Sequence, residues 1–374
     1  MGDASAGRGM RPPHSISLSI SNQPRGAFMH RPVLFNAICA AMTAIAAAGP
    51  LSAHAQAGPA PKEIRILESG GASGDSIEQA YIKPFTARTG IKVTRESPTS
   101  AGKLQAMVQS KNVTSVLVEL GATNVVAARA LGLLEPLDWA AINPAPVYPE
   151  AKWPDAFGYQ YSSTIMAWGK GSKQPKTWAD FWNVKDFPGK RALPDYPGYA
   201  LPLALLADGV APDKLYPLDI DRAFASLQKI KGSVAVWWKA GAQAPQLLED
   251  KEVAYSAAWS GRIVGNPKID YTYNQGLLQL AYFVVPKGAD PAAKAAAMGL
   301  LHEMSKLENQ LVATNVIPYT GASPGIEKMV PKEKIDDYPT TEANKKLQVQ
   351  ADPTWTADNA KLIEKRWQEF KLGL

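Results

Sequence analysis

The chain has 374 residues, a length at which a single hydrophobic core usually gives way to two domains. With 46% hydrophobic and 20% charged residues it has the composition of an ordinary globular protein, and its net charge at neutral pH is +6. This small basic excess gives no case for nucleic-acid binding, which needs a strongly basic surface.

The first 55 residues have the pattern of a secretion signal. Arg31 supplies a positive start, residues 33–48 are apolar, and Ala53-His54-Ala55 fits a small-residue cleavage site. The apolar run is short for a membrane span. We therefore predict a leader and signal peptide over residues 1–55, with the true start at Met29, cleavage near Ala55 and release into the periplasm.

Removal of that segment changes the composition of the mature chain. Four arginines and Asp3 are lost, so the net charge falls from +6 to +3, and the single cysteine, Cys39, is lost as well. Of the four histidines only His302 remains. We therefore expect no disulfide, no thiol chemistry, no histidine-based metal site, no cofactor and no histidine-dependent catalytic triad.

Strand and helix patterns alternate along the mature chain. Residues 63–68 form the first predicted strand, followed by a loop of small residues at 69–74 and a helix that ends at Gly90. Further strands are predicted at residues 91–95, 116–120, 159–168, 191–194 and 279–285, and further helices at 200–206, 221–231, from Asp290-Pro291 and near the C-terminus. This alternation predicts an α/β fold with parallel strands.

Two strands in the middle of the chain end in aromatic residues. Residues 233–238 form a strand ending in Trp237-Trp238, a turn and a helix at 243–249 follow, and the strand at 253–258 runs into Trp259-Ser260-Gly261-Arg262. An open α/β sheet binds its ligand outside the carboxyl ends of its strands. Aromatic faces and approachable glycine backbone are therefore expected where a ligand would lie.

The long patterns at residues 159–168 and 279–285 are interpreted as segments that cross between two lobes, with a further crossing near residues 318–321. We predict lobe 1 from residues 61–165 and 283–318, and lobe 2 from residues 166–282 and 319–374. Ile363, Trp367 and Phe370 share one face of the last helix and are expected to pack against a lobe.

Four sequence blocks carry a family resemblance: TWADFWNVKDFPGKRALPDYPG, LLADGVAPDKLYPLDIDRAF, VWWKAGAQ and AWSGR. With these blocks the chain resembles the polyamine-type (spermidine/putrescine-like) solute-binding proteins of bacterial ABC importers, in extracellular solute-binding family 1. The resemblance implies a type II periplasmic binding fold with a ligand cleft between two α/β lobes. It also implies a monomer without enzymatic activity whose partners are a small-molecule ligand, a membrane permease and its ATPase.

The resemblance carries over to the binding site only in part. Trp259 matches the tryptophan of the family's W-N-G block, which walls the ligand. The acidic residues that hold ammonium groups in polyamine binders fall here on Tyr196, Tyr199 and Ala281. Arg262 adds a cation, and an arginine fork binds carboxylates rather than amines. We therefore predict a small carboxylate or an amino-acid-like or γ-aminobutyrate-like zwitterion as the ligand.

In the predicted site Arg262 binds the ligand carboxylate, and Trp238, Trp259 and Tyr161 enclose the rest, with cation–π contact for any ammonium. The predicted ligand-binding residues are Gly71, Tyr161, Ser162, Tyr196, Tyr199, Trp238, Gly241, Gln243, Trp259, Arg262 and Tyr282. Simpler readings stay open: a surface or hinge salt bridge for Arg262, a plain turn for residues 69–74, core packing for Tyr282, and a solvated or helix-facing role for Glu119.

Two other functions were considered. A ferric-ion-binding transport protein would need paired tyrosines, whereas Tyr271 and Tyr273, like Tyr159 and Tyr161, are spaced by two. An exported hydrolase needs a nucleophile with a base, and the chain has no G-x-S-x-G motif. We therefore predict neither an enzyme nor a metal site, and the sequence does not separate transport from a sensing role.

Overall fold

The structure is a computed structural model that describes residues 59–373. The predicted signal peptide, with Met29, Cys39 and the cleavage site at Ala55, lies outside the described residues. Within residues 59–373 no helix is long and apolar enough to cross a membrane.

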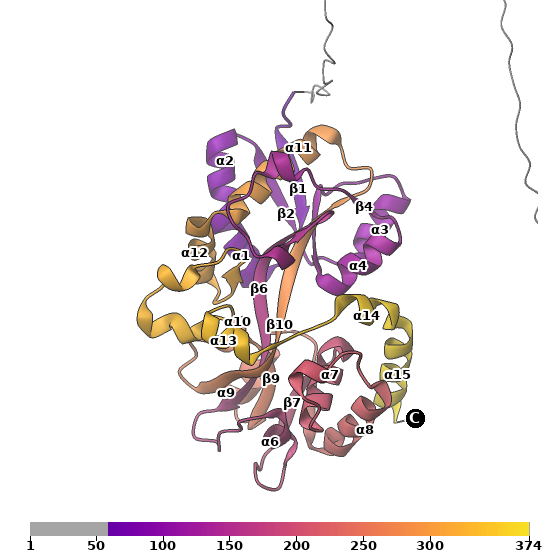
Figure 1. The fold of residues 1–374 in the computed structure, drawn as a ribbon, viewed down its shortest axis with the longest axis vertical. Coiled ribbons are helices and arrows are strands. Elements are labelled where there is room, and N and C mark those ends of the chain that lie inside the picture. The colour runs from indigo at the N-terminus through magenta and orange to yellow at the C-terminus, as the bar shows by residue number, and fades with distance from the viewer. Residues whose placement is uncertain (1–58, 374) are drawn as a thin grey trace, which may run out of the picture. The chain divides into compact units, whose positions relative to one another are not determined.

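The described chain is a mixed α/β structure built on one sheet (Figure 1). Its strands are β1 (Glu63–Leu67), β2 (Lys92–Glu96), β3 (Leu117–Gly121), β4 (Leu134–Glu135), β5 (Lys152–Trp153), β6 (Ala156–Gly169), β7 (Arg191–Pro194), β8 (Val234–Trp238), β9 (Tyr255–Trp259), β10 (Ile269–Pro286), β11 (Thr320–Gly321) and β12 (Val349–Gln350). The main order is β2-β1-β3-β10-β6-β9-β7-β8.

Fifteen α-helices occur in the described residues. They are α1 (Gly71–Ile77), α2 (Lys83–Thr89), α3 (Ala101–Gln109), α4 (Ala122–Ala130), α5 (Trp139–Ile142), α6 (Trp178–Trp182), α7 (Pro197–Ala207), α8 (Ile220–Ile230), α9 (Gln243–Glu249), α10 (Ser260–Ile263), α11 (Pro291–Ser305), α12 (Leu307–Val316), α13 (Glu342–Leu347), α14 (Pro353–Asp358) and α15 (Ala360–Leu372). A π-helical segment, Glu78–Ile82, joins α1 to α2.

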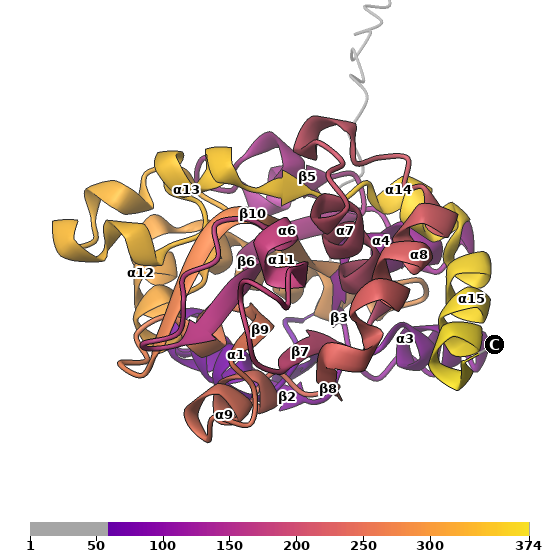
Figure 2. The same ribbon diagram turned by 90° about the horizontal axis from the view of Figure 1, so that it is seen from below.

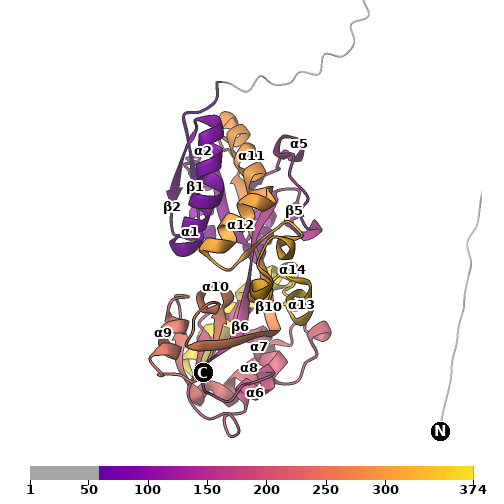
Figure 3. The same cartoon turned by 90° about the vertical axis from the view of Figure 1, so that its left-hand side faces the viewer.

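The strands β6 and β10 are the longest and pair with each other in the middle of the sheet. They run antiparallel and extend through both halves of the fold (Figure 3). The group β1, β2 and β3 is parallel within itself, as is the group β7, β8 and β9. The predicted parallel strands are thus confirmed in both groups, while the pair that joins the groups is antiparallel.

Helices cover both faces of the β1–β3 half. One apolar cluster joins β1 to α2, α11 and the π-helical segment, with Ile66, Phe85 and Leu301 among its buried residues. A second cluster, on α3 and α4, contains Leu104 and Val125. Figure 1 shows α2, α11 and α12 on one side of these strands and α3 and α4 on the other. Parallel strands are normally covered in this way because both faces are apolar.

The β7–β9 half is covered on both faces as well. One apolar cluster joins α7, α8 and α15 to the strands, with Leu193, Phe224 and Trp367 among its residues. Another joins α9 to the strands through Trp238 and Leu248. In the view of Figure 2, α7 and α8 lie on one side of β7 and β8, and α9 lies on the other. Ile363, Trp367 and Phe370 of α15 are buried, as predicted.

The apolar clusters meet along β6 and β10. Phe157 and Phe283 belong to the cluster around α11, whereas Trp168 and Leu277 belong to the cluster around α7. The division into lobes at residues 165/166 and 282/283 stays a prediction. Residues 320–323, assigned to lobe 2, lie on the elements of lobe 1: β11 pairs with β6, and the backbone N–H of Ser323 donates to Oε1 of Gln310 (3.1 Å) on α12.

Local hydrogen bonds and a glycine define several helix ends. The hydroxyl of Thr177 accepts a hydrogen bond from the backbone N–H of Asp180, whose carboxylate completes a capping box. Asp290 caps α11, and Gly90 ends α2 in the left-handed conformation. The predicted loop at residues 69–74 is shorter in the structure, because α1 begins at Gly71. Gly74 makes this possible, since a Cβ there would lie 2.6 Å from the Glu68 carboxylate.

Arg191 anchors the start of β7. Its side chain is fully buried, and burial lowers the pKa of its guanidinium. No carboxylate pairs with it among residues 59–373; instead its nitrogens donate to the backbone carbonyls of Phe181 (3.1 Å), Phe187 and Gly189. One charged side chain therefore satisfies three carbonyls and holds the segment before β7 in place.

Arg191→Met is expected to lower the free energy of unfolding by about 3 kcal/mol or more, because three carbonyls lose a charged donor and each unmade bond costs about 1–3 kcal/mol. Urea unfolding followed by tryptophan fluorescence measures this. The exposed neighbour provides the control: Lys190→Met should stay within about 0.5 kcal/mol of the unaltered protein. Equal losses in both variants would show that the buried bonds of Arg191 do not anchor the strand.

Candidate ligand-binding site

The register of the sheet directs two sets of strand ends toward each other. At the carboxyl end of β3, Gly121 pairs with Ala281 of β10. At the carboxyl end of β9, Trp259 pairs with Thr164 of β6, which itself pairs with Leu277. Leu277 and Ala281 are four positions apart on β10, so roughly 14 Å of strand separates the two ends. Ligands of open α/β sheets bind at such carboxyl ends.

Trp259 is the centre of an aromatic cluster at the ends of β7, β8 and β9. Its ring centroid lies 5.2 Å from that of Trp238, edge to face, and 6.4 Å from that of Tyr196, nearly parallel. Tyr199 adds a second edge contact at 6.3 Å. Four aromatic residues that the sequence analysis assigned to the site are thus brought together, and Trp259 is partly exposed among them.

Trp238 lies beneath this cluster rather than on its surface. Its exposed fraction is 0%, and its indole N–H donates to the carbonyl of Ala257 (2.9 Å). Trp237, on the opposite face of β8, packs against Trp367 and Phe370. Both sides of the double tryptophan are used in packing, so Trp238 supports Trp259 from below, and its role in enclosing a ligand stays a prediction.

The turn after β8 lies directly on the indole of Trp259. A Cβ on Gly241 would be 2.5 Å from Cε3 of Trp259 and 3.6 Å from Cγ of Arg262, so only glycine allows this approach. Gln243 shapes the same turn, since its Oε1 accepts from the backbone N–H groups of Lys239 (2.8 Å) and Ala240 (3.0 Å). Gln243 is therefore near the cluster, but its carbonyl oxygen is already engaged.

Arg262, in the short helix α10, lies where the two halves of the fold meet. A Cβ built on Gly71, at the start of α1, would lie 3.7 Å from Nη2 of Arg262. The Nε atom is buried without a hydrogen-bond partner, and no carboxylate of residues 59–373 lies within salt-bridge distance of the guanidinium. The simpler reading of Arg262 as a salt bridge therefore does not match the described structure.

Tyr319 belongs to this site, although its role was not predicted. A Cβ on Gly261 would lie 2.6 Å from Cε1 of Tyr319, so the tyrosine ring covers the turn that carries Arg262. Burial raises the pKa of the Tyr319 hydroxyl, and the neighbouring Arg262 charge opposes that shift. Tyr319 lies in the predicted crossing at residues 318–321, and a crossing next to a strand end is the sequence signal for its place in the site.

Tyr161 and Tyr282 point away from the cluster. Alternation along a strand places neighbours on opposite faces, so Tyr161 and Ser162 cannot share a site. The Tyr161 hydroxyl donates to Oε1 of Glu150 (2.9 Å), and the Tyr282 hydroxyl donates to the Glu150 carbonyl (2.8 Å). The structure thus places both hydroxyls at Glu150 and not at the aromatic cluster, and their roles in ligand binding stay predictions. Ser162 is partly exposed and pairs with Gln279 of β10.

Glu119, at the end of β3, is buried with 5% of its surface exposed. Its Oε2 accepts from the backbone N–H of Ser69 (2.7 Å) and its Oε1 from the Tyr159 hydroxyl (2.9 Å). Burial raises the pKa of Glu119, and these two hydrogen bonds only partly offset the effect. A solvated role for Glu119 is therefore excluded. Ser69, whose backbone N–H donates to Glu119, is two residues from Gly71.

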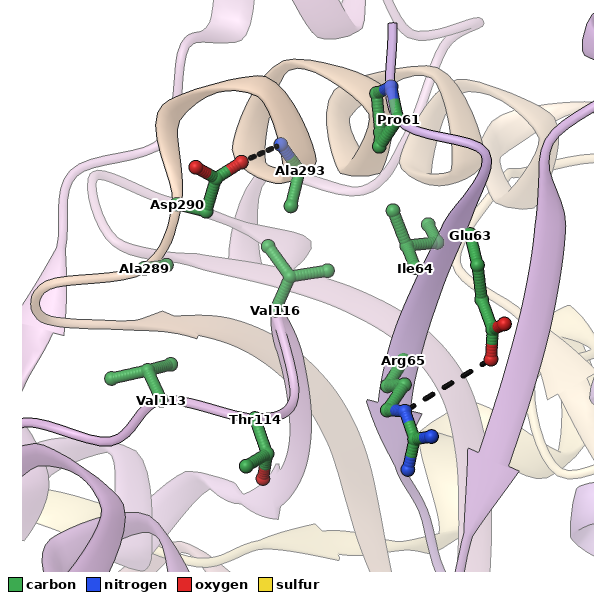
Figure 4. Close-up of a pocket in the computed structure, with 10 residues that line it drawn as sticks. All are labelled: Pro61, Glu63, Ile64, Arg65, Val113, Thr114, Val116, Ala289, Asp290 and Ala293. Carbon is green, nitrogen blue, oxygen red and sulfur yellow. Dashed lines mark hydrogen bonds and ion pairs between the residues drawn. The ribbon is translucent and has the colours of Figure 1, made fainter.

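Two surface pockets lie elsewhere in the described structure. One is lined by residues of β1, the segment before β3 and the start of α11 (Figure 4). There Arg65 pairs with Glu96 (3.1 Å) and Glu63 (3.9 Å), so its charge is already engaged. The other pocket lies around Gly169, Lys190 and Lys268. Neither contains a predicted ligand-binding residue, and neither brings together groups with obvious chemistry.

No group of three or more histidine, cysteine, aspartate or glutamate side chains that could hold a metal ion occurs within residues 59–373. The tyrosine pair considered for ferric iron is engaged as well: Tyr271 donates to Oδ1 of Asp337 and Tyr273 to the Asp337 carbonyl, both at 2.7 Å. The arrangement around Arg262 can instead bind a small anion next to aromatic faces.

Comparison with solved structures identifies the class of protein. An ABC transporter substrate-binding protein from Bradyrhizobium japonicum USDA 110 matches with a TM-score of 0.78 and 33% identity, over 83% of this chain and 99% of that one. The Atu4243-GABA receptor matches with a TM-score of 0.75 and 30% identity, over 82% and 97%. The fold is therefore that of the periplasmic binding proteins, as predicted.

Sequence comparison gives the family. The family model described as bacterial extracellular solute-binding protein matches residues 80–343. The gamma-aminobutyric acid-binding protein of Pseudomonas aeruginosa PAO1 is 33% identical over 322 residues, which are 83% of this chain and 91% of that protein. The chain belongs to the bacterial extracellular solute-binding family.

Membership in this family establishes the role at a coarse level. Its members are substrate-binding components of ABC transporters, which bind small molecules and work with a membrane permease rather than catalyse a reaction. The family also indicates a periplasmic protein. The ferric-ion and hydrolase alternatives gain no support from these matches.

Gly241→Ala is expected to displace the Trp259 ring, because the new Cβ would overlap Cε3. Overpacking of this kind costs about 1–3 kcal/mol of stability. Near-UV circular dichroism should report the altered tryptophan packing, and thermal unfolding the lower stability. Gly232→Ala is the matched control, since a Cβ there meets no atom within 4 Å. An unchanged aromatic spectrum for Gly241→Ala would contradict the close packing of this turn on Trp259.

Proposed function

We propose that this protein captures a small carboxylate or an amino-acid-like zwitterion, such as γ-aminobutyrate, for a polyamine-type ABC importer. The observation that carries the proposal is the guanidinium of Arg262, which is partly buried next to Trp259 and has no carboxylate partner in residues 59–373. A buried cation without a counter-charge is costly, and a ligand carboxylate would offset that cost through two parallel hydrogen bonds.

The named ligands of two relatives support the same chemistry. The Pseudomonas aeruginosa protein is a gamma-aminobutyric acid-binding protein, and the Atu4243 structure is that of a GABA receptor. Both similarities extend over more than four fifths of this chain. In this proposal Tyr196, Tyr199 and Trp259 enclose the aliphatic part of the ligand, with Gly71 and Gly241 giving its polar ends access to the backbone.

A polyamine is the less favoured ligand, because an ammonium group at the aromatic cluster would meet the like charge of Arg262 there. The nearest acidic residue at the end of β7 is Asp195. Its carboxylate already accepts from the indole N–H of Trp367 (2.8 Å) and lies near Lys371 (3.2 Å) and Lys239 (3.7 Å). Two lysines thus neutralise the Asp195 carboxylate that a polyamine would need. In this proposal the resemblance to polyamine-type proteins describes the kind of importer and not the solute it carries.

The remaining parts of the proposal follow from this role. The first 55 residues act as a leader that is removed near Ala55, and the mature protein works as a monomer in the periplasm. Lobe 1 and lobe 2 close over the ligand along β6 and β10, and the closed form is recognised by the permease. Gly71 and Arg262 come from different lobes, so a ligand between them would favour closure.

A thermal-shift screen tests the ligand class. γ-Aminobutyrate, other amino acids and small organic acids are expected to raise the unfolding temperature, because a ligand at a hundred times its Kd stabilises the native state by about 2.7 kcal/mol. Putrescine, spermidine and Fe³⁺ should give no shift. A shift with the two polyamines alone would overturn the proposal and restore a polyamine as the solute.

Arg262→Ala is expected to weaken γ-aminobutyrate binding by at least about 100-fold, because two charge-assisted hydrogen bonds of about 1.5–3 kcal/mol each would be lost. Isothermal titration calorimetry measures the change. Arg222→Ala is the control. It removes an equal charge from the surface of α8, where Arg222 pairs with Asp208, and it should leave the affinity unchanged. Unaltered binding by Arg262→Ala would remove Arg262 from the site.

A further inference from the structure

Four charged side chains are buried in the described residues. Three of them are paired with an opposite charge or with several backbone carbonyls, and the fourth, Glu119, is not. Glu68 lies 3.5 Å from Nε of Arg95, and Glu303 pairs with Arg88 (2.8 Å) and Lys306 (2.9 Å). Arg191 is held by three carbonyls, as described above. Glu119 has no ion pair within residues 59–373 and contacts only neutral donors.

The short segment from Ser69 to Gly71 connects Glu119 to the other charge without a partner in residues 59–373, that of Arg262. The carboxylate of Glu119 accepts from Ser69, and two residues later Gly71 faces Nη2 of Arg262. Both charges act on Tyr319, since Arg262 lowers the pKa of its hydroxyl and Glu119 raises it. The ring of Tyr319 covers the turn at Gly261 that carries Arg262.

The carboxylate of Glu119 retains capacity for a further donor. An ionised carboxylate has about four acceptor positions, and only two are occupied here, one on each oxygen. A buried carboxylate is stabilised mainly by a nearby cation. Among residues 59–373 no arginine or lysine supplies that cation to Glu119, and the neighbouring Glu68 carboxylate raises the pKa of Glu119 further, so a positive group of a ligand would meet a buried acid without a counter-charge.

We propose that Glu119 binds the ammonium group of a ligand whose carboxylate is bound by Arg262, so that the solute class is a zwitterion rather than a simple carboxylate. This inference rests on the proposed function and adds a specificity-determining residue to it. Glu119 comes from β3 and Arg262 from α10, so each end of the zwitterion is bound by a different half of the fold. Simple monocarboxylates would satisfy only one of the two charges.

The experiment compares γ-aminobutyrate with butyrate, which has the same carbon chain without the ammonium group. Calorimetric titrations of the unaltered protein and of Glu119→Gln give the ratio of the two affinities. We expect Glu119→Gln to weaken γ-aminobutyrate binding by about tenfold or more, the size of a hydrogen bond to a charged group, and to leave butyrate binding unchanged. Equal changes for both ligands would reduce Glu119 to a residue that holds the loop at Ser69.

Tyr159→Phe is the matched control. It removes one neutral donor from Glu119 but keeps the carboxylate, so the ratio of the two affinities should stay that of the unaltered protein. Butyrate binding by each variant also verifies that its site is folded. A ratio that changes as much in Tyr159→Phe as in Glu119→Gln would overturn the assignment of the charge of Glu119 to the ligand.

A measurement on the unaltered protein keeps the proposal testable if Glu119→Gln does not fold. 4-Hydroxybutyrate replaces the ammonium group by a neutral hydroxyl, and it should bind at least about tenfold more weakly than γ-aminobutyrate. Equal affinities would overturn the role of Glu119 while leaving the proposed carboxylate site intact. Failure of all three ligands to bind, together with no thermal shift for any amino acid or organic acid, would instead overturn the proposed function itself.

Discussion

The antiparallel pair of β6 and β10 is the constraint on which the rest of the structure depends. Each strand contributes side chains to the apolar clusters of both halves, so neither half has a complete core without them. The two parallel groups attach at different stretches of this pair. The carboxyl end of β3 lies opposite Ala281, and the carboxyl end of β9 lies, across β6, level with Leu277, so both ends fall within one short stretch of β10. That register brings the turn after β1 and the turn after β9 into contact. Gly71 and Arg262 therefore come together because of strand pairs that join distant parts of the chain, such as Gly121 with Ala281 and Thr164 with Leu277.

Elements with strong local patterns could be predicted from the sequence. The strand at residues 191–194 and the helix at residues 243–249 have the predicted bounds, and Thr177 and Asp290 cap helices through local hydrogen bonds. The start of α1 could not be predicted, because it depends on the close approach of Gly74 to the Glu68 carboxylate, a tertiary contact. The length of β10 was underestimated for a similar reason: its first half is polar and owes its conformation to pairing with β6.

In the candidate site, too, some residues could be located from local sequence patterns and others only from tertiary contacts. Trp259, Tyr196 and Arg262 follow strand ends, and their convergence is a property of any open α/β sheet, so they could be located without coordinates. Which of two adjacent tryptophans is covered depends on the packing of α15 and Trp259, which no local pattern contains. Tyr161 and Ser162 are neighbours on opposite faces of β6, so one position of strand alternation decides which of them faces the aromatic cluster. Glu119 and Tyr319 became apparent only when burial and charge partners were known.

The pairing of β10 also determines when this chain can fold. Ala281 and its partner Gly121 are 160 residues apart, and contacts of such separation make folding slow because a long loop must close before they form. During synthesis, the β1–β3 half lacks its central neighbour until β10 has left the ribosome. The last third of the chain therefore decides when the first third becomes compact. Until then the growing polypeptide lacks its native packing, which is the state that passage through a narrow pore requires.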